Sequence, residues 1–210
     1  MNRFLTFEGV EGSGKSTQSA RLADVLKRAG HEVVTTREPG GTELGRSLRA
    51  ILLEADSVAP TAETELLLYL ADRSEHVIRL IQPALNRGAV VIADRFSDST
   101  IAYQSYGRGL DLETVKQIDL FARSGIAPSR TFLLDLPVEE GLARARQVGP
   151  ADRLEQEKIE FHQRVRHGFH QLAAAEPDRM VTLDARTEVT TLSQEISTDV
   201  LSWIGEPFCS

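Results

Sequence analysis

The feature that most constrains this chain is a glycine-rich loop near its N-terminus, Gly9-Val10-Glu11-Gly12-Ser13-Gly14-Lys15-Ser16. It lies between a short apolar run, Phe4–Phe7, and a segment with helical periodicity, Thr17–Ala29. A strand, a G-x-x-x-x-G-K-S loop and a helix in this order predict a phosphate-binding loop. Glycines let backbone N–H groups curl around phosphate oxygens, and a helix N-terminus favours negative charge. We therefore expect residues 9–17, Thr17 included, to hold a nucleotide, with Lys15 at its β- and γ-phosphates and Ser16 on Mg²⁺.

The rest of the chain alternates between short apolar runs and longer segments with helical periodicity. The runs typical of strands are Phe4–Phe7, His31–Thr36, Ala89–Ala93, Thr131–Leu136 and Met180–Leu183. The helical segments after the first are Thr42–Leu53, Ala62–Asn86 (interrupted by Pro83), Asp98–Tyr106, Leu112–Ser124, Val138–Arg146, Lys158–Ala175 and Val189–Ile204. Five strands separated by helices predict a mostly parallel sheet covered on both sides, a three-layer α/β/α sandwich.

Composition places the chain among ordinary globular proteins. Its 210 residues, 41% hydrophobic and 26% charged, suit one domain spanning 1–210. A net charge of −7 argues against non-specific binding to nucleic acid or an anionic membrane. The single cysteine, Cys209, excludes a disulfide within one chain. With no signal peptide and no apolar run long enough to span a membrane, we expect a cytoplasmic protein.

Two acidic residues follow buried strands and lie at the edge where such sheets bind ligands. Asp94, at the end of the third apolar run, is placed to hold Mg²⁺, and Arg95 beside it to meet a phosphate. Glu8 ends the first run at the same edge and is a candidate second metal-side carboxylate or base. The phosphate loop alone leaves several enzyme classes open. Because the chain has no N-K-x-D or S-G-G-Q motif, we favour a small-molecule kinase or ligase over a GTPase or transporter ATPase.

Several further segments, in order along the whole chain, carry a family resemblance. They are TREPGGT (Thr36–Thr42), LLLYLADR (Leu66–Arg73), DRFSDSTIAYQ (Asp94–Gln104), GRG (Gly107–Gly109) and DRLEQE (Asp152–Glu157). With the phosphate loop, they resemble the thymidylate kinase family. The resemblance implies a P-loop nucleoside monophosphate kinase fold with strand order 2-3-1-4-5. It also implies an ATP- and Mg²⁺-dependent enzyme that converts dTMP to dTDP, a step in dTTP synthesis, and a homodimer formed through helices such as Ala62–Asn86.

The resemblance assigns an acceptor site. Arg37 and Arg95 would face the acceptor phosphate, with Glu38 and Pro39 shaping the turn and Arg49 as a third candidate, since guanidinium forks suit a dianion. Tyr69 and Arg73, one helical turn apart, would stack on the thymine and donate to its O4. The family's usual aromatic is phenylalanine. Three residues would line base and sugar, with the tyrosine disfavouring a 2′-hydroxyl: Thr100, Tyr103 and Gln104.

The donor side requires a cation at the transition state, because phosphoryl transfer spreads charge over the equatorial oxygens. The variable positions of the phosphate loop hold none, so we expect a mobile lid at about 144–157 to supply an arginine. Arg153 is the first choice because DRLEQE resembles the family's lid motif, and Arg144 and Arg146 are the alternatives. Arg186, after the last strand, would pack near adenine. The catalytic set is then Lys15, Arg95, Arg153 and Glu8.

Two other functions stay open from the sequence. One is a kinase for another pyrimidine monophosphate or for a deoxynucleoside. The turn from Arg37 to Gly41 favours a monophosphate, because a nucleoside brings no phosphate to clamp. The other is a nucleotide-binding regulator without catalysis. Five residues that catalysis would need are all present, which argues against it: Lys15, Ser16, Asp94, Arg95 and Arg153.

Overall fold

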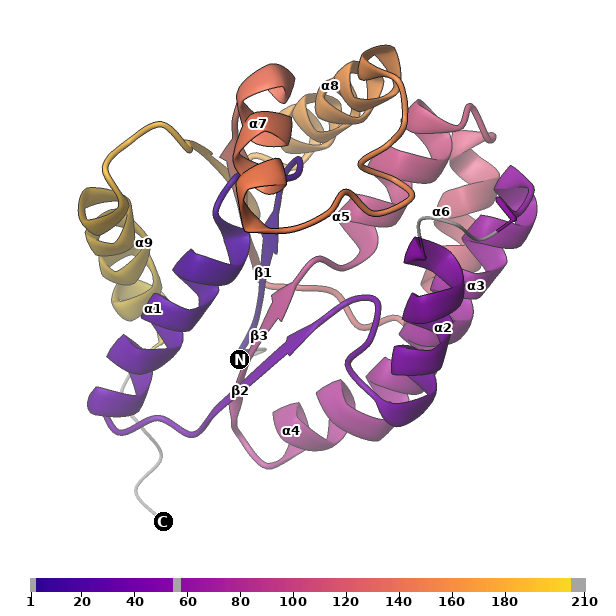
Figure 1. The fold of residues 1–210 in the computed structure, drawn as a ribbon. Coiled ribbons are helices and arrows are strands. Elements are labelled where there is room, and N and C mark those ends of the chain that lie inside the picture. The colour runs from indigo at the N-terminus through magenta and orange to yellow at the C-terminus, as the bar shows by residue number, and fades with distance from the viewer. Residues whose placement is uncertain (1–2, 55–57, 205–210) are drawn as a thin grey trace.

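One parallel sheet organises the molecule (Figure 1). The computed structural model describes residues 3–54 and 58–204, so the residues around Asp56 and Cys209 lie outside the described residues. The strands are β1 (Phe4–Glu8), β2 (Val33–Arg37), β3 (Val90–Asp94), β4 (Arg130–Asp135) and β5 (Met180–Asp184). Their order is β2-β3-β1-β4-β5, which confirms the expected α/β fold and strand order.

Helices cover both faces of this sheet. They are α1 (Lys15–Arg28), α2 (Glu43–Leu53), α3 (Ala62–His76), α4 (Gln82–Asn86), α5 (Ser97–Thr100), α6 (Leu112–Ala122), α7 (Val138–Val148), α8 (Ile159–Ala175) and α9 (Val189–Ile204). Two further segments have wider, π-helical turns, η1 (Val77–Ile81) and η2 (Ile101–Gly107). Helices α1 and α9 pack together on one face, and η1, α4, η2 and α8 lie on the other. Among the described helices, none is both long and apolar enough to cross a membrane.

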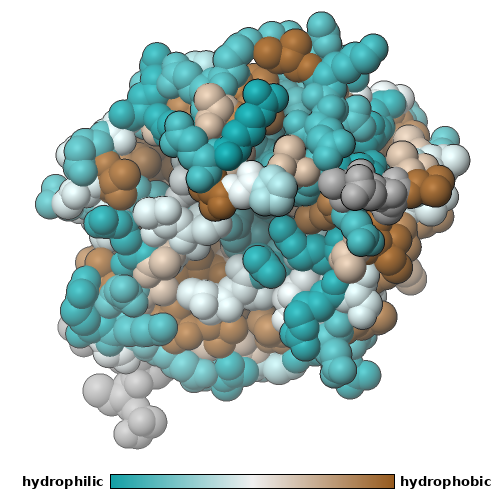
Figure 2. All heavy atoms as spheres, in the orientation of Figure 1, coloured by the Kyte–Doolittle hydropathy of each residue, from teal (hydrophilic) through white to brown (hydrophobic). Residues whose placement is uncertain are grey.

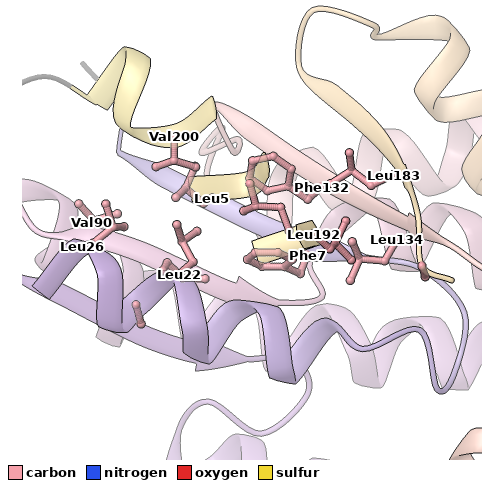
Figure 3. Packing of buried hydrophobic residues seen from close by; sticks show 14 of the residues in the cluster. Leu5, Phe7, Leu22, Leu26, Val90, Phe132, Leu134, Leu183, Leu192 and Val200 are labelled. Atoms are coloured by element: carbon pink, nitrogen blue, oxygen red, sulfur yellow. The ribbon is translucent and has the colours of Figure 1, made fainter. Parts of the chain in front are cut away.

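The central strand β1, with the sequence FLTFE, is buried on both faces, as a central strand of a parallel sheet is expected to be. Leu5 and Phe7 point toward α1 and α9, where they meet residues such as Leu22 and Leu192 (Figure 3). Phe4, one residue earlier, points to the opposite face and packs edge-on against Phe96. Each such side chain stabilises the fold by about 1.5–3 kcal/mol through burial. Both apolar layers hold β1 in place, and β1 leads directly into the phosphate loop.

Two predicted helices differ in detail from the observed ones. The segment after Ala62 stays helical through Asn86 instead of breaking at Pro83, because η1 widens the turn just before it. Pro83 is then the second residue of α4, where a missing N–H is tolerated. Likewise the segment expected to be a helix from Asp98 becomes the short α5 followed by η2.

The carboxyl ends of all five strands meet at one edge of the sheet. Polar side chains end every strand there: Glu8, Arg37, Asp94, Asp135 and Asp184. Arg37 is in register with Asp94 on the neighbouring strand, and Phe7, just before the phosphate loop, is in register with Asp94 from the other side. The sheet therefore brings the phosphate loop, the turn after β2 and the acid of β3 to one place.

Candidate active site

The phosphate loop, residues 9–16, folds back over its own lysine. Lys15 Nζ donates to the carbonyl oxygens of Val10 at 2.8 Å and Gly9 at 3.1 Å. Burial, together with the nearby charge of Arg95, lowers the Lys15 pKa to about 8. Gly12 has a φ of 68°, and a Cβ there would lie 2.1 Å from the carbonyl oxygen of Gly141 on α7. Only glycine fits at this close approach between the loop and α7.

An oxygen pair links the phosphate loop to β3. Ser16 Oγ, in the first turn of α1, donates to Asp94 Oδ2 at 2.5 Å. A hydroxyl and a carboxylate are the hard oxygen ligands that Mg²⁺ accepts, usually with several waters retained. In the described residues, no group of three or more His, Cys, Asp or Glu side chains is arranged to hold a metal ion. The oxygen donors of the Ser16–Asp94 pair fit a magnesium ion that substrate phosphates and water also bind.

Arg95 joins the phosphate loop to the helical segment that follows β3. Its φ of 70° is a left-handed backbone conformation, which costs a non-glycine residue about 1–3 kcal/mol. Nη1 donates to Gly9 O and to Ser99 Oγ, each at 3.0 Å. Nη2 donates to Glu11 Oε1 at 3.1 Å and to Tyr103 Oη at 3.2 Å. Four contacts thus fix this guanidinium at the carboxyl edge of the sheet.

Side chains of α2 and α3 hold the turn after β2 in place. The Glu38 side chain points inward and is 4% exposed, and the Glu38–Pro39 peptide bond is cis. Arg49 Nη1, on α2, donates to the Pro39 carbonyl at 3.0 Å. Gly40 N donates to Asp72 Oδ1 at 3.2 Å. The turn is therefore fixed by α2 and α3 together.

Arg73 is a buried residue of α3, with 2% of its surface exposed. Its guanidinium donates to Glu38 through Nε and Nη2, and to Asp119 Oδ1 and Thr100 Oγ1 through Nη1. Two carboxylates compensate the charge, and together these contacts immobilise the side chain at the cavity wall. Tyr69, one turn earlier on α3, lines the same wall.

A cavity of about 270 Å³ lies at this edge of the sheet. The face shown in Figure 2 has hydrophilic side chains around a recess near its centre. The predicted site residues that line the cavity are Glu11, Gly12, Lys15, Ser16, Arg37, Glu38, Pro39, Arg49, Tyr69, Arg73, Asp94, Arg95, Thr100, Tyr103 and Gln104. The end of the phosphate loop therefore lines the same cavity as the residues that are expected to bind the phosphate and the base of the acceptor.

The model of the thymidylate kinase family matches residues 7–196. The chain belongs to the thymidylate kinase family. The thymidylate kinase of a Synechococcus strain is 56% identical over 183 residues, which cover 87% of this chain and 86% of that protein. The thymidylate kinase of Trichlorobacter lovleyi is 48% identical and covers 97% of this chain and 99% of its own length.

A solved structure agrees with this membership. The crystal structure of thymidylate kinase from Ehrlichia chaffeensis has a TM-score of 0.79 and 34% identity, covering 95% of this chain and 98% of that one. Thymidylate kinases are ATP-dependent kinases, which favours the enzyme over the nucleotide-binding regulator without catalysis.

Eight predicted site residues of this thymidylate kinase are not among those that line the cavity: Gly9, Val10, Ser13, Gly14 and Thr17 of the phosphate-loop segment, and also Glu8, Arg153 and Arg186. Glu8 is fully buried and accepts from Phe96 N and Ser99 Oγ, and burial and the charge of Asp98 raise its pKa to about 8. These contacts join the end of β1 to the segment that follows β3. Arg186, expected near adenine, is exposed and pairs with Asp184.

Arg153 also lies outside the cavity lining. It is 7% exposed, and its Nη2 donates to Glu65 Oε2 while its Nε donates to Leu52 O. Asp152, Leu154 and Glu155, from the segment expected to form a lid, nevertheless line the cavity. Arg153 links this segment to α2 and α3. Sequence pattern could not show this, because its partners come from α2 and α3.

Several residues at the site were not foreseen. Leu53, Phe96 and Ser99 line the cavity with the lid residues, and Glu65 and Asp119 hold arginines behind it. Acidic residues in a first helical turn or on a helix face are common on protein surfaces. The sequence therefore did not indicate that Glu65 and Asp119 would be buried partners of arginines. The resemblance did include the segments that contain Ser99 and the lid residues.

Proposed function

We propose that this kinase transfers the γ-phosphoryl group of Mg²⁺-bound ATP in line to dTMP, giving dTDP for dTTP synthesis in the cytoplasm. The observation that carries the proposal is the shared cavity. Lys15 and the Ser16–Asp94 pair, proposed to bind the donor, line the same cavity as Arg37 and Arg49, proposed to bind the acceptor. Phosphates bound to these two groups of residues would lie close together, which is the main requirement of phosphoryl transfer.

On the donor side, Ser16 and Asp94 would hold Mg²⁺, directly or through water. The ion would neutralise charge on the phosphates. Lys15 would leave the Gly9 and Val10 carbonyls and bond the β- and γ-phosphates, while N–H groups of residues 9–17 cradle them.

On the acceptor side, the dTMP phosphate would bind Arg37, Arg49 and Arg95, whose planar forks make paired bonds to phosphate oxygens. Arg37 is exposed within the cavity and free to turn toward the ligand. Tyr69 would stack on the thymine ring, and Arg73 would donate to its O4. Tyr103, bonded through its hydroxyl to Glu11, would lie against the deoxyribose and exclude a 2′-hydroxyl.

For the transition state, we propose that the lid supplies an arginine and that Arg144 is the best placed. The side chain of Arg144 begins on the face of α7 that touches Gly12 of the phosphate loop. It is exposed, and its Nη1 donates to the Ala185 carbonyl at 3.1 Å. Arg153, by contrast, already shares its charge with Glu65. An arginine compensated by a buried carboxylate has less charge to offer a phosphoryl group.

The decisive experiment measures ADP release with ATP, Mg²⁺ and a panel of acceptors. We expect strong turnover with dTMP, weaker turnover with dUMP, and none with AMP, GMP or thymidine. Preference for another monophosphate would reject the base assignment of Tyr69 and Arg73 while leaving the phosphate machinery in place. Turnover with thymidine itself would reject the acceptor-phosphate clamp.

We also propose that the enzyme is a homodimer formed through α3 and α6, which pack against each other (Figure 1). These helices expose apolar side chains, with Leu67 61%, Leu120 50% and Phe121 85% accessible. A second copy would bury them. Light scattering should give twice the subunit mass for the wild type and the subunit mass for Phe121→Glu. A wild-type mass of one subunit would reject the proposal.

A further inference from the structure

Glu65 is a buried carboxylate in the first turn of α3, with 1% of its surface exposed. Three side chains from distant parts of the chain donate to it. Gln104 Nε2 lies 3.0 Å from Oε1, Arg108 Nε lies 2.9 Å from the same oxygen, and Arg153 Nη2 lies 2.5 Å from Oε2. Arg108 adds a second bond, from Nη2 to Oε2 at 3.0 Å. One of these donors, Gln104, also lines the cavity.

The two arginines determine the charge of Glu65. Burial alone would favour the neutral acid, but the hydrogen bonds and charges of Arg108 and Arg153 lower the Glu65 pKa. Guanidinium groups can only donate, and an ionised carboxylate can only accept. Glu65 is therefore fixed as an acceptor.

This fixed acceptor decides which way the Gln104 amide turns. A glutamine amide has a donating NH₂ on one arm and an accepting carbonyl on the other, and the two arms are otherwise interchangeable in shape. Because Glu65 cannot donate, Gln104 must direct its NH₂ toward Glu65. The carbonyl then occupies the other arm of the amide, beside the cavity that Tyr69 and Arg73 also line.

We propose that Glu65 is a specificity-determining positioning residue, which orients Gln104 so that a pyrimidine with an N3–H is accepted and one without it is rejected. Thymine and uracil carry a hydrogen on N3, which the Gln104 carbonyl accepts. Cytosine has a lone pair at that position, which faces the same carbonyl unfavourably. This inference rests on the proposed function, because it places the acceptor base beside Gln104.

The test is the substitution Glu65→Gln. A neutral amide at position 65 both donates and accepts, so Gln104 is free to turn either arm to the cavity. The kcat/KM of dTMP divided by that of dCMP should fall at least tenfold, through KM more than kcat, because a mispaired polar group costs that much. Glu63→Gln is the control, since Glu63 is an exposed acid of the same helical turn. It should leave the ratio unchanged.

The outcomes separate the two proposals. A wild-type enzyme inactive on dTMP would reject the proposed function. An active wild type and a folded Glu65→Gln variant with the wild-type ratio would reject the role of Glu65. A double variant with Gln104→Leu gives a further check. In that background Glu65→Gln should change the ratio no further, whereas an additional loss would indicate a merely structural effect.

A measurement on the wild type covers the case in which Glu65→Gln does not fold. Neutron diffraction from crystals exchanged into D₂O distinguishes ND₂ from oxygen in the Gln104 side chain. We expect deuterium density on the arm facing Glu65. Oxygen on that arm, with a deuteron on Glu65, would overturn the proposal.

Discussion

Arg73 and Glu38 form a buried ion pair, with Arg73 Nη2 2.6 Å from Glu38 Oε2 and both side chains almost inaccessible to solvent. His76 Nδ1 lies 2.8 Å from the other oxygen of Glu38. The proposed base-binding arginine is thus tied to the turn that is proposed to hold the acceptor phosphate. Removing one partner of such a pair costs about 3–5 kcal/mol. Base and phosphate sites are therefore parts of one rigid unit.

The close packing of this unit predicts the effect of Gly41→Ala. A Cβ on Gly41 would lie 2.5 Å from His76 Nε2 and 2.7 Å from Thr36 Oγ1, so the turn must move away from α3. We expect the KM for dTMP to rise at least tenfold, with a smaller change in the KM for ATP. Steady-state kinetics with each substrate varied in turn measure both. Equal effects on the two KM values would contradict a local displacement of the acceptor turn.

Asp72 predicts a pH dependence of stability. Its side chain is fully buried, and burial, together with the charge of Glu38, raises its pKa from 3.8 to about 6. Folded protein therefore binds this proton more tightly than unfolded protein does, so ionised Asp72 lowers stability above pH 6. The effect vanishes as pH falls toward 4.

Asp72→Asn removes this charge and keeps an acceptor for Gly40 N. At pH 8 the variant should be more stable than the wild type by roughly 1–3 kcal/mol, and at pH 4 the difference should disappear. Urea unfolding at the two pH values measures it. A difference that grows as pH falls would have the wrong sign for a raised carboxyl pKa.

The Ser16–Asp94 oxygen pair predicts a magnesium defect in Asp94→Asn. The amide is a weaker ligand and carries no charge, so the Mg²⁺ concentration for half-maximal rate should rise and kcat should fall more than tenfold. The KM for dTMP should change less. Magnesium titrations of the initial rate test this. Asp24→Asn, which removes an exposed charge from the same helix as Ser16, is the matched control and should titrate like the wild type.

The two lid arginines predict different kinetic defects. Arg144→Ala should lower kcat more than tenfold with little change in the KM for dTMP, because it removes charge needed only at the transition state. Arg153→Ala should instead lower the melting temperature, since it unfastens the lid and leaves Glu65 less compensated. If Arg153→Ala lowered kcat to that extent at an unchanged melting temperature and KM, the transition-state role would belong to Arg153.

Local pattern was enough for much of the fold. The apolar run Val90–Ala93 is buried on both faces, so its sequence specifies a central strand without reference to the rest of the chain. The phosphate loop is equally local, because its glycines and the flanking strand and helix are contiguous. The strand order came from the family resemblance, because the sequence of an individual strand does not show which strands lie beside it.

Side-chain partners across the site could not be predicted in the same way. Arg153 and Glu65 are 88 residues apart and meet only because the segment that contains Arg153 folds against α3. Glu8 ends a strand at the expected edge, yet its side chain turns beneath the site to Ser99. The direction in which such a side chain points depends on how distant elements pack against each other. The local hydrophobic periodicity of a single sequence carries no information about that packing.

The position of β1 also has a consequence for synthesis of the chain. β1 precedes the other four strands in the chain but lies in the middle of the sheet, where Phe4 pairs with Val91 and Leu5 with Arg130. During translation this strand has no partner until much of the protein has left the ribosome. Such long-range pairing slows folding and prolongs exposure of apolar strands. The nascent phosphate loop therefore acquires its final support late.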